Sequence, residues 1–311
     1  MIPVYNAPAG YLEETLRSIL QQDPGPDQMQ IEVVDDCSPN GAPLELVRRI
    51  AGDRVIVHRE PKNNGLAGIW NRCIERASGE WVHILHQDDL VLPGFYTALR
   101  RGVGTNPQIG AAFVRHATIN PKGHWMALSA LEREAAGVLD GWHERITVQQ
   151  FIQCPAIVVR RSVYEKLGGF LPQLRFTLDW EMWQRIAAKH LFWFEPAILA
   201  CYRLHPSSAT SRLRKDAADT RDIDKMTELT KSYHPLARGA KLAMQARLYY
   251  ALHAVGQARQ LLVDGHADVA GRQLSAALKL APRWPVFYQA ASFMWLRLRL
   301  LVAGVKRDLV K

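Results

Sequence analysis

Cysteine is scarce in this sequence, and the few residues present are spread along the chain. The 311 residues include four cysteines, and no two of them form a CxxC pair: Cys37, Cys73, Cys154 and Cys201. A structural zinc site and a disulfide framework are therefore not expected. This pattern is typical of a protein that works in a reducing compartment.

Long apolar runs are also missing. No uninterrupted run reaches the roughly 20 residues that a membrane-spanning helix requires. The nearest approach, residues 286–305, is broken by Arg297 and Arg299. No segment has the pattern of a signal peptide. We therefore expect a cytoplasmic protein.

Acidic residues are the minority among the charged residues. The formal net charge is +9, and the excess is concentrated after residue 282, where six basic residues accompany the single acid Asp308. A positive chain favours anionic partners such as a nucleoside diphosphate or an anionic membrane surface. The sequence lacks a basic stripe with interleaved aromatic residues, so we expect no nucleic-acid partner.

Strands and helices alternate through the first half of the chain. We expect strands near 2–5, 31–34, 55–57 and 81–85, separated by helices near 11–22, 44–51 and 66–77. This order is typical of βαβ units and a largely parallel sheet. The first strand is short, so we expect either a poorly anchored strand or a natural start upstream of Met1.

Two acidic pairs follow predicted strands. Asp35-Asp36 and Asp88-Asp89 come directly after apolar segments, at the sheet edge where α/β proteins bind ligands. Either pair could instead be structural. Asp88-Asp89 could cap a helix starting near Pro93, and Asp35-Asp36 could belong to the turn at residues 38–41. Two pairs on successive strand ends favour a ligand site.

Two residues in the second half are further candidates. Asp179 opens a helix predicted over 179–190, where it is either a general base or a partner of the helix dipole. Glu181 should project elsewhere and be solvated. His205 follows an apolar segment at 191–204 with a turn at Pro196. It is either a metal ligand or a structural histidine.

The C-terminal third is predicted to be helical. A charged, exposed helix should cover 211–231, and an antiparallel pair should cover 241–255 and 269–280. The tail then combines apolar and basic residues, so it could lie in an anionic membrane interface or pack on the protein. These residues are Phe287, Phe293, Trp295, Leu296, Leu298, Leu300, Leu301 and Val302, with Arg297, Arg299, Lys306, Arg307 and Lys311.

An ordered series of segments resembles the family 2 glycosyltransferases. The series begins with Ile2-Pro-Val-Tyr-Asn6, Val33-Val-Asp-Asp-Cys-Ser38, Asn64-Gly-Leu-Ala67 and Leu85-His-Gln-Asp-Asp89. It continues with Arg160-Arg-Ser-Val-Tyr-Glu-Lys-Leu-Gly-Gly-Phe170, Leu178-Asp-Trp-Glu181 and Tyr202-Arg-Leu-His205. The order of these segments is more specific than any one of them.

The resemblance implies an α/β, GT-A-type fold: a Rossmann-like mixed, mostly parallel sheet flanked by helices, with a C-terminal helical appendage. The catalytic domain would span 1–210, with a nucleotide-binding half at 1–104 and an acceptor half at 105–210. A charged linker helix at 211–234 and a helical region with a basic amphipathic tail at 235–311 would follow.

The resemblance also implies the chemistry. Asp179 would be the catalytic base of an inverting hexosyl or deoxyhexosyl transfer from a nucleotide sugar. Mg²⁺ or Mn²⁺ would be held by Asp89, Asp88 and His205. The nucleotide would be bound by Pro3, Tyr5, Asp35, Asp36 and Asp88.

The acceptor would be a glycan or a lipid-linked molecule in surface polysaccharide synthesis, reached from the cytoplasmic face of the membrane. A catalytically silent homologue that only binds a nucleotide sugar or a glycan is the alternative. Three positions depart from the family pattern. His86 replaces the first aspartate of the usual DxDD, Leu178 replaces an acid, and Trp70 replaces an arginine found in some members.

Overall fold

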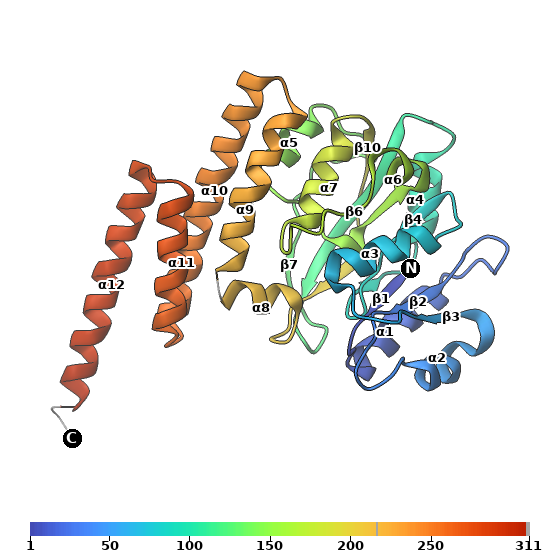
Figure 1. Cartoon of the computed structure of the whole chain (residues 1–311), viewed down its shortest axis with the longest axis horizontal. Coiled ribbons are helices and arrows are strands. Elements are labelled where there is room, and N and C mark those ends of the chain that lie inside the picture. Colours follow the sequence, from blue (N-terminus) through green and yellow to red (C-terminus); the bar gives the residue numbers. More distant parts are fainter. Residues whose placement is uncertain (216, 309–311) are drawn as a thin grey trace. The chain divides into compact units, whose positions relative to one another are not determined.

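The computed structural model describes residues 1–215 and 217–308, with side chains described for 1–214 and 217–297. The chain divides into two compact units (Figure 1). The first comprises Met1–Ile146 and Gln150–His205, and the second comprises Thr147–Gln149 and Pro206–Lys311. The catalytic domain predicted from the sequence ends at residue 210.

A small parallel sheet opens the first unit. Its strands are β1 (Ile2–Val4), β2 (Glu32–Asp35) and β3 (Ile56–Arg59), in that spatial order. Helices α1 (Ala9–Leu20) and α2 (Leu44–Ala51) connect them, and α3 (Gly65–Arg76) follows. The expected βαβ units are therefore present. All four residues of β2 are buried, as expected for a central parallel strand.

A larger mixed sheet forms the rest of this unit. Its order is β4-β9-β6-β10-β5, with β7 on β6 and β8 on β10. Only β6 and β10 pair in parallel; the other described pairs of this sheet are antiparallel. The strand bounds are β4 Trp81–His83, β5 Leu90–Val91, β6 Ile109–Ile119, β7 Trp125–Leu128, β8 Gly137–Val138, β9 Ile157–Arg160 and β10 Leu191–Arg203.

Backbone hydrogen bonds link the two sheets. The amino group of Met1 donates to the carbonyl of His83 at 2.9 Å, and the Leu85 N–H donates to the Met1 carbonyl at 3.1 Å. Strand β1 therefore lies beside the end of β4. As a consequence, the loops that carry the two acidic pairs leave β2 and β4, the strands on either side of β1, at the same edge.

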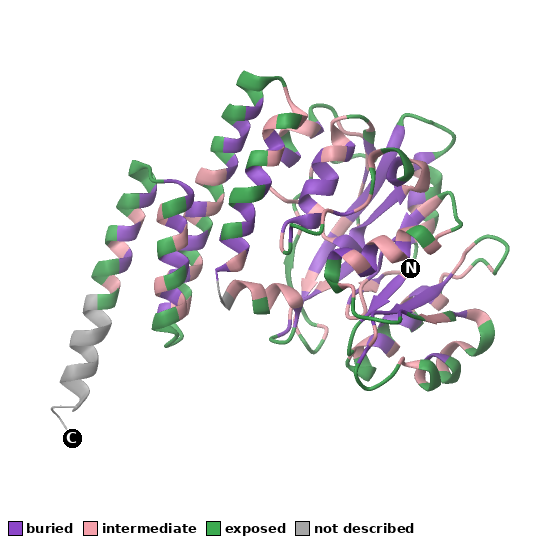
Figure 2. Ribbon diagram, viewed as in Figure 1, coloured by how far each residue is buried: buried purple, intermediate pink, exposed green. Residues whose placement is uncertain are grey.

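Amphipathic helices cover the sheets, and the buried residues are the purple stretches of ribbon in Figure 2. Helix α1 buries Leu12 and Leu16, as their four-residue spacing predicts, together with Ile19. The remaining helices of this unit are α4 (Phe95–Val103), α6 (Arg161–Leu167), α7 (Leu178–Ala187) and the first residues of α5 (Trp142–Val148), with 3₁₀ turns at Gly52–Arg54 and Cys154–Ala156.

Two local predictions were wrong. A turn was expected at Pro196, but β10 continues through it. The register with β6 slips between Glu195 and Ile198, and this irregularity accommodates a residue that has no N–H to donate. Glu181 was expected in solvent. Instead it is fully buried on α7, where its carboxylate pairs with Arg185 at 2.9 Å.

The second unit is helical. It contains α8 (Ala209–Lys215), α9 (Ala218–Thr230), a 3₁₀ turn at Lys231–Tyr233, α10 (Leu236–Val263), α11 (Ala267–Leu280) and α12 (Trp284–Asp308). The expected antiparallel pair corresponds to α10 and α11, with α10 much longer than predicted.

The charged segment at 211–231 is not the exposed helix we expected. Helix α9 buries Ile223 and Met226 and packs on α10 and α11. None of the described helices combines the length and apolar character that a membrane span needs. Of the predicted tail, Leu298, Arg299, Leu300, Leu301, Val302, Lys306, Arg307 and Lys311 have side chains outside the described residues.

Candidate active site

In the first acidic pair, Asp35 is held by hydrogen bonds from nearby residues. Asp35, the last residue of β2, is fully buried and accepts hydrogen bonds from the N–H and hydroxyl of Ser38. The Arg59 guanidinium also donates to Asp35, at 2.9 Å. Asp35 therefore shapes the turn that follows β2, as the structural alternative for this pair predicted.

Asp36 holds the start of α3. Its carboxylate accepts the backbone N–H groups of Asn64 at 2.7 Å and Gly65 at 3.1 Å, and the Asn64 side-chain amide at 3.1 Å. Burial raises the pKa of Asp36, and these donors oppose the increase. The arrangement fixes the Asn-Gly loop beside the carboxyl edge of the sheet.

The N-terminal motif lies against the second acidic segment. Tyr5 is 46 % exposed, whereas Pro3 is buried inside β1 opposite Val34. The Tyr5 backbone N–H donates to Gln87 Oε1 at 2.8 Å, and Gln87 Nε2 donates back to the Tyr5 carbonyl at 3.3 Å. This amide fastens the loop after β1 to the loop after β4.

Asp88 and Asp89 lie in the turn between β4 and β5. They do not cap a helix, because α4 begins only at Phe95 and its N-cap residue is Gly94, which has no side chain to form a cap. The helix-cap alternative is therefore wrong. The Asp89 carbonyl accepts the Thr15 hydroxyl at 2.8 Å, which anchors the turn on α1.

The end of β10 completes the surroundings of this pair. The Arg203 N–H donates to Asp89 Oδ1 at 2.8 Å, and the Arg203 guanidinium donates to the Asp88 carbonyl at 2.8 Å. His205 Nε2 lies 2.7 Å from Asp88 Oδ2. The structure therefore brings the three predicted metal ligands, Asp88, Asp89 and His205, into one contiguous group.

His86 joins the same group. His86, Asp88 and Asp89 each place a potential ligand atom within 4.8 Å of the other two. Asp89 is 1 % exposed, and its Oδ2 has no hydrogen-bond partner among the described residues; the same is true of His86 Nε2. A buried carboxylate oxygen without a donor is costly, so the donor set fits a divalent cation.

The charges of Asp88, Asp89 and His86 also favour a bound divalent cation. Burial raises the pKa of Asp89 and the Asp88 charge adds to the effect, while His86 opposes it. Burial disfavours a charge on His86, but Asp89 and Asp88 hold its pKa above the usual value. Additional positive charge at this point would stabilise both carboxylates.

Asp179 lies in the first turn of α7, behind its N-cap residue Thr177. Its Oδ1 accepts the Trp180 N–H at 2.7 Å, and the Gln150 side chain favours the charged form of the carboxylate. Burial raises the pKa of Asp179 to about 6, although these two residues and the charge of His86 oppose the increase. Asp179 and His86 each affect the other's pKa through their charges, so the two side chains lie within electrostatic range of each other.

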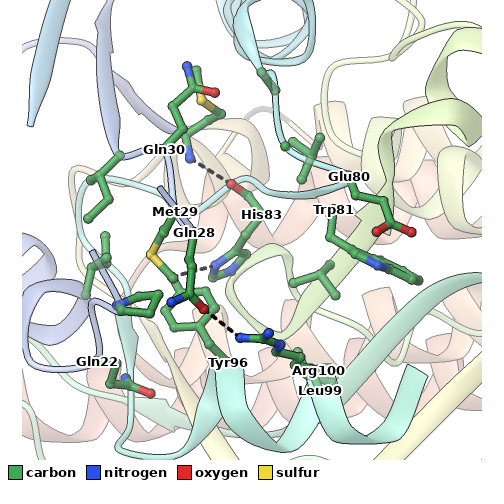
Figure 3. A pocket seen from close by; sticks show the side chains of 18 of the residues that line it. Gln22, Gln28, Met29, Gln30, Glu80, Trp81, His83, Tyr96, Leu99 and Arg100 are labelled. Carbon is green, nitrogen blue, oxygen red and sulfur yellow. Dashed lines mark hydrogen bonds between the residues drawn. The ribbon is translucent and has the colours of Figure 1, made fainter. Parts of the chain in front are cut away.

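A large cavity lies elsewhere. It measures about 590 Å³ and is lined by residues such as Met29, Trp81, His83 and Tyr96, with Arg100 donating to Gln28 at 2.9 Å (Figure 3). None of the predicted site residues lines it. The cavity lies beside β4 and α4, and neither Asp88 nor Asp89 lines it.

Sequence reasoning missed several residues that build the site. Gln87 and Arg203 lie inside quoted motifs, but a motif does not show which backbone atom a side chain will meet. Gln150 carries no motif and could not have been found. His86 was noted only as a departure, although its spacing from Asp88 and Asp89 was the available signal.

The chain matches the family model described as glycosyl transferase family 2 over residues 1–168. It is 27 % identical over 245 residues to an uncharacterised protein of Mycobacterium tuberculosis, covering 71 % of this chain and 72 % of that one. It is 36 % identical over 89 residues to TuaG of Bacillus subtilis, named for teichuronic acid biosynthesis. That match covers 28 % of this chain and 34 % of TuaG.

Two solved structures share the fold. The Staphylococcus aureus TarS fragment 1–349, in complex with UDP-GlcNAc, superposes with a TM-score of 0.68 and 15 % identity, covering 95 % of this chain and 88 % of that one. The mannosyltransferase PcManGT of Pyrobaculum calidifontis, in complex with GDP-Man and Mn²⁺, superposes with a TM-score of 0.59 and 18 % identity. This match covers 96 % of this chain and 79 % of that one. The predicted α/β, GT-A-type fold is confirmed.

Proposed function

This chain belongs to glycosyl transferase family 2, and we propose that it transfers a sugar, with inversion, from a nucleoside diphosphate sugar to an acceptor hydroxyl. The observation that carries the proposal is the cluster of Asp88 and Asp89 at the carboxyl edge of the sheet, with a buried carboxylate oxygen left without a donor. A divalent cation, Mn²⁺ or Mg²⁺, would neutralise the leaving diphosphate at this point.

The protein's own residues would position that cation. Asp89 is held by the Arg203 N–H through one oxygen, which leaves the other oxygen to bind the ion. Asp88 is oriented by His205, whose Nε2 lies 2.7 Å from Asp88 Oδ2, so His205 would support the ion through Asp88. Because these contacts exist before any ligand arrives, little reorganisation would accompany binding.

Asp179 would accept the proton of the acceptor hydroxyl. A base is most effective when its pKa lies near the working pH, and burial raises the pKa of Asp179 to about 6. The Trp180 N–H donates to Oδ1 and so orients the carboxylate. Attack from the face opposite the diphosphate would invert the configuration at the sugar carbon.

The nucleotide would lie over the loops after β1 and β2. The exposed Tyr5 ring can stack on a base. Asp36 would hydrogen-bond the base while it fixes the Asn-Gly loop, and Asp35 and Pro3 would support the strand ends from within. Asp88 would approach the nucleotide from the other side.

The acceptor would be a growing glycan or a lipid-linked sugar of a surface polysaccharide. TuaG, which resembles part of this chain, is named for teichuronic acid biosynthesis. TarS, which shares the fold, was solved with UDP-GlcNAc, and PcManGT with GDP-Man and Mn²⁺. These neighbours support a uridine or guanosine diphosphate sugar as the first donors to test.

The second unit would hold the enzyme on an anionic membrane surface. Helix α12 packs on α10 and α11 through Val286, Ala290 and Phe293, and its opposite face is exposed. At about 100° per residue that face is a single stripe, formed by Trp284 (77 % exposed), Phe287, Tyr288, Met294 and Trp295.

The positive charge of the C-terminal segment also supports attachment to an anionic membrane surface. Residues 269–307 contain seven basic and no acidic residues. Tryptophan and tyrosine favour the membrane–water interface, and each basic residue near an anionic surface contributes about 1 kcal/mol. Peripheral attachment would bring the catalytic unit within reach of a lipid-linked acceptor.

Release of free nucleoside diphosphate tests the activity. The protein is incubated with a panel of UDP- and GDP-sugars, with Mn²⁺, with Mg²⁺ and with EDTA, and water takes the sugar as the acceptor. An active transferase releases nucleotide from a subset of donors only when a metal is present. A catalytically silent homologue would bind a donor without releasing nucleotide, and this result would overturn the proposal.

A further inference from the structure

We propose that His86 is a direct ligand of the metal at Asp88 and Asp89, and that its nitrogen makes the site select Mn²⁺ over Mg²⁺. This inference rests on the metal-dependent function proposed above. It concerns the position at which this chain departs from the DxDD pattern, where His86 stands in place of the first aspartate.

The separation of the donor atoms supports coordination. His86 Nδ1 lies 3.5 Å from Asp89 Oδ2, which is within ion-pair range for a protonated ring but longer than an ordinary hydrogen bond. Two ligands bound to one ion, each about 2.1 Å from it, lie about 3 Å apart when they are neighbours in an octahedron. The observed separation is therefore close to that of two ligands sharing an ion, and only a small movement would be needed.

The available lone pairs point to the same conclusion. Asp89 is 1 % exposed, its Oδ1 is occupied by the Arg203 N–H, and its Oδ2 has no donor among the described residues. A carboxylate oxygen this deeply buried is stabilised only by a donor or a cation. Asp88 adds a third ligand atom within 4.8 Å of the other two.

The His86 ring is already held in place. It stacks on Trp70 with 4.8 Å between ring centroids and an interplanar angle of 23°. Trp70 is itself buried and meets the edge of Phe170 at 4.9 Å. A ligand whose orientation is fixed by packing loses little freedom when it binds metal. Trp70, which stands where some members of the family carry arginine, thus supports the imidazole.

The donor set determines the metal preference. Mg²⁺ prefers oxygen ligands and gives up its water reluctantly. Imidazole nitrogen binds first-row transition ions more readily, and their affinity exceeds that of Mg²⁺ at mixed nitrogen–oxygen sites. A site of one imidazole and two carboxylates is therefore expected to bind Mn²⁺ much more tightly than Mg²⁺. With aspartate at position 86, the same site would contain only oxygen ligands.

The test compares metal binding to the full-length wild type and to His86→Asp. Binding of Mn²⁺, with and without UDP or GDP, is followed by electron paramagnetic resonance, and Mg²⁺ is added as a competitor. Replacing the nitrogen by oxygen should lower the Mn²⁺-to-Mg²⁺ affinity ratio by about tenfold or more. His124→Asp, the same change at an exposed histidine, should leave the ratio unaltered.

Pulsed resonance of the bound Mn²⁺ adds a direct readout. Coupling to an imidazole nitrogen is expected in the wild type and should weaken or vanish in His86→Asn, which preserves side-chain size. Full nitrogen coupling in that variant, or equal affinity ratios in wild type and His86→Asp, would overturn the role of His86. Either result would leave the proposed metal site standing. Absence of Mn²⁺ binding by the wild type would also remove the proposed metal site.

Discussion

The side chains of Asp88 and His205 meet, with 2.7 Å between Oδ2 and Nε2, although 117 positions separate them in the chain. The contact joins the loop after β4 to the end of β10. Arg203 strengthens the junction from the same strand, because it donates to both Asp88 and Asp89. The geometry of the proposed metal site therefore depends on a long-range contact as well as on the acidic motif.

Replacement of His205 should weaken the site without unfolding the protein. His205→Ala frees the Asp88 carboxylate to rotate, and loss of such an outer partner lowers metal affinity by about 10–100-fold. Isothermal titration with Mn²⁺ and a nucleoside diphosphate measures the change. His124→Ala, at an exposed position, is the matched control. Unchanged affinity in His205→Ala would show that the contact does not orient Asp88.

Asp179→Asn should separate catalysis from donor binding. The amide keeps the shape of the side chain but cannot take the acceptor proton, so transfer should fall by about 10²–10⁴-fold. Donor affinity, measured by titration of the nucleotide sugar, should be nearly unchanged. A collapse of donor affinity instead would place Asp179 in the donor site and leave the base unidentified.

The pH profile of transfer should show an acid limb from the same residue. The folded-state pKa of Asp179 is raised to about 6, so the active carboxylate is lost as the pH falls through that value. A bound cation would lower this pKa, so kcat/KM should rise up to a midpoint at or below about 6 and then level off. The residual activity of Asp179→Asn should lack this limb. The same midpoint in both proteins would assign the titration to another group.

The buried pair of Glu181 and Arg185 makes a prediction about stability. Arg185 also donates to the carbonyls of Leu167 and Gly169, so removing its carboxylate partner leaves a largely buried guanidinium. Glu181→Ala should lower the free energy of unfolding by about 3–5 kcal/mol. Glu165→Ala removes an exposed partner of Arg161 at the same helical spacing and should cost at most about 1 kcal/mol. Equal denaturation midpoints for the two variants would contradict this account.

The exposed face of α12 predicts binding to anionic vesicles. Full-length protein should float with vesicles containing phosphatidylglycerol, and added salt should weaken this binding because it screens the basic residues. The double variant Trp284→Ser, Trp295→Ser should float less. Trp125→Ser, which removes an exposed tryptophan from β7, is the control. Equal flotation of both variants, or salt-dependent self-association in place of flotation, would contradict membrane attachment.

The sequence predicted what depends on local patterns. Asp35-Asp36 and Asp88-Asp89 could be placed at strand ends because a short apolar run and the polar residues after it lie together in the chain. The register of β6 and β10 could not be predicted, nor could the Arg203 contacts that fix Asp88 and Asp89, because these contacts form only in the folded chain.

Two errors have physical causes. Glu181 was placed in solvent because a charged residue is costly to bury, but Arg185 one turn later provides the partner that makes burial tolerable. The segment at 211–231 was expected to be exposed because of its charge. Its apolar residues Ile223 and Met226 recur at helical spacing and are enough to bury one face of α9.

The most direct test of the account is metal-dependent nucleotide release by wild type, Asp89→Ala and Asp89→Asn. The asparagine variant keeps an acceptor for the Arg203 N–H but removes the charge, so it separates loss of function from loss of fold. Release should require Mn²⁺ or Mg²⁺ in the wild type and in Asp27→Ala, an exposed control, and should be abolished in both Asp89 variants. Wild-type release by either Asp89 variant would contradict the central claim that Asp89 holds the catalytic metal.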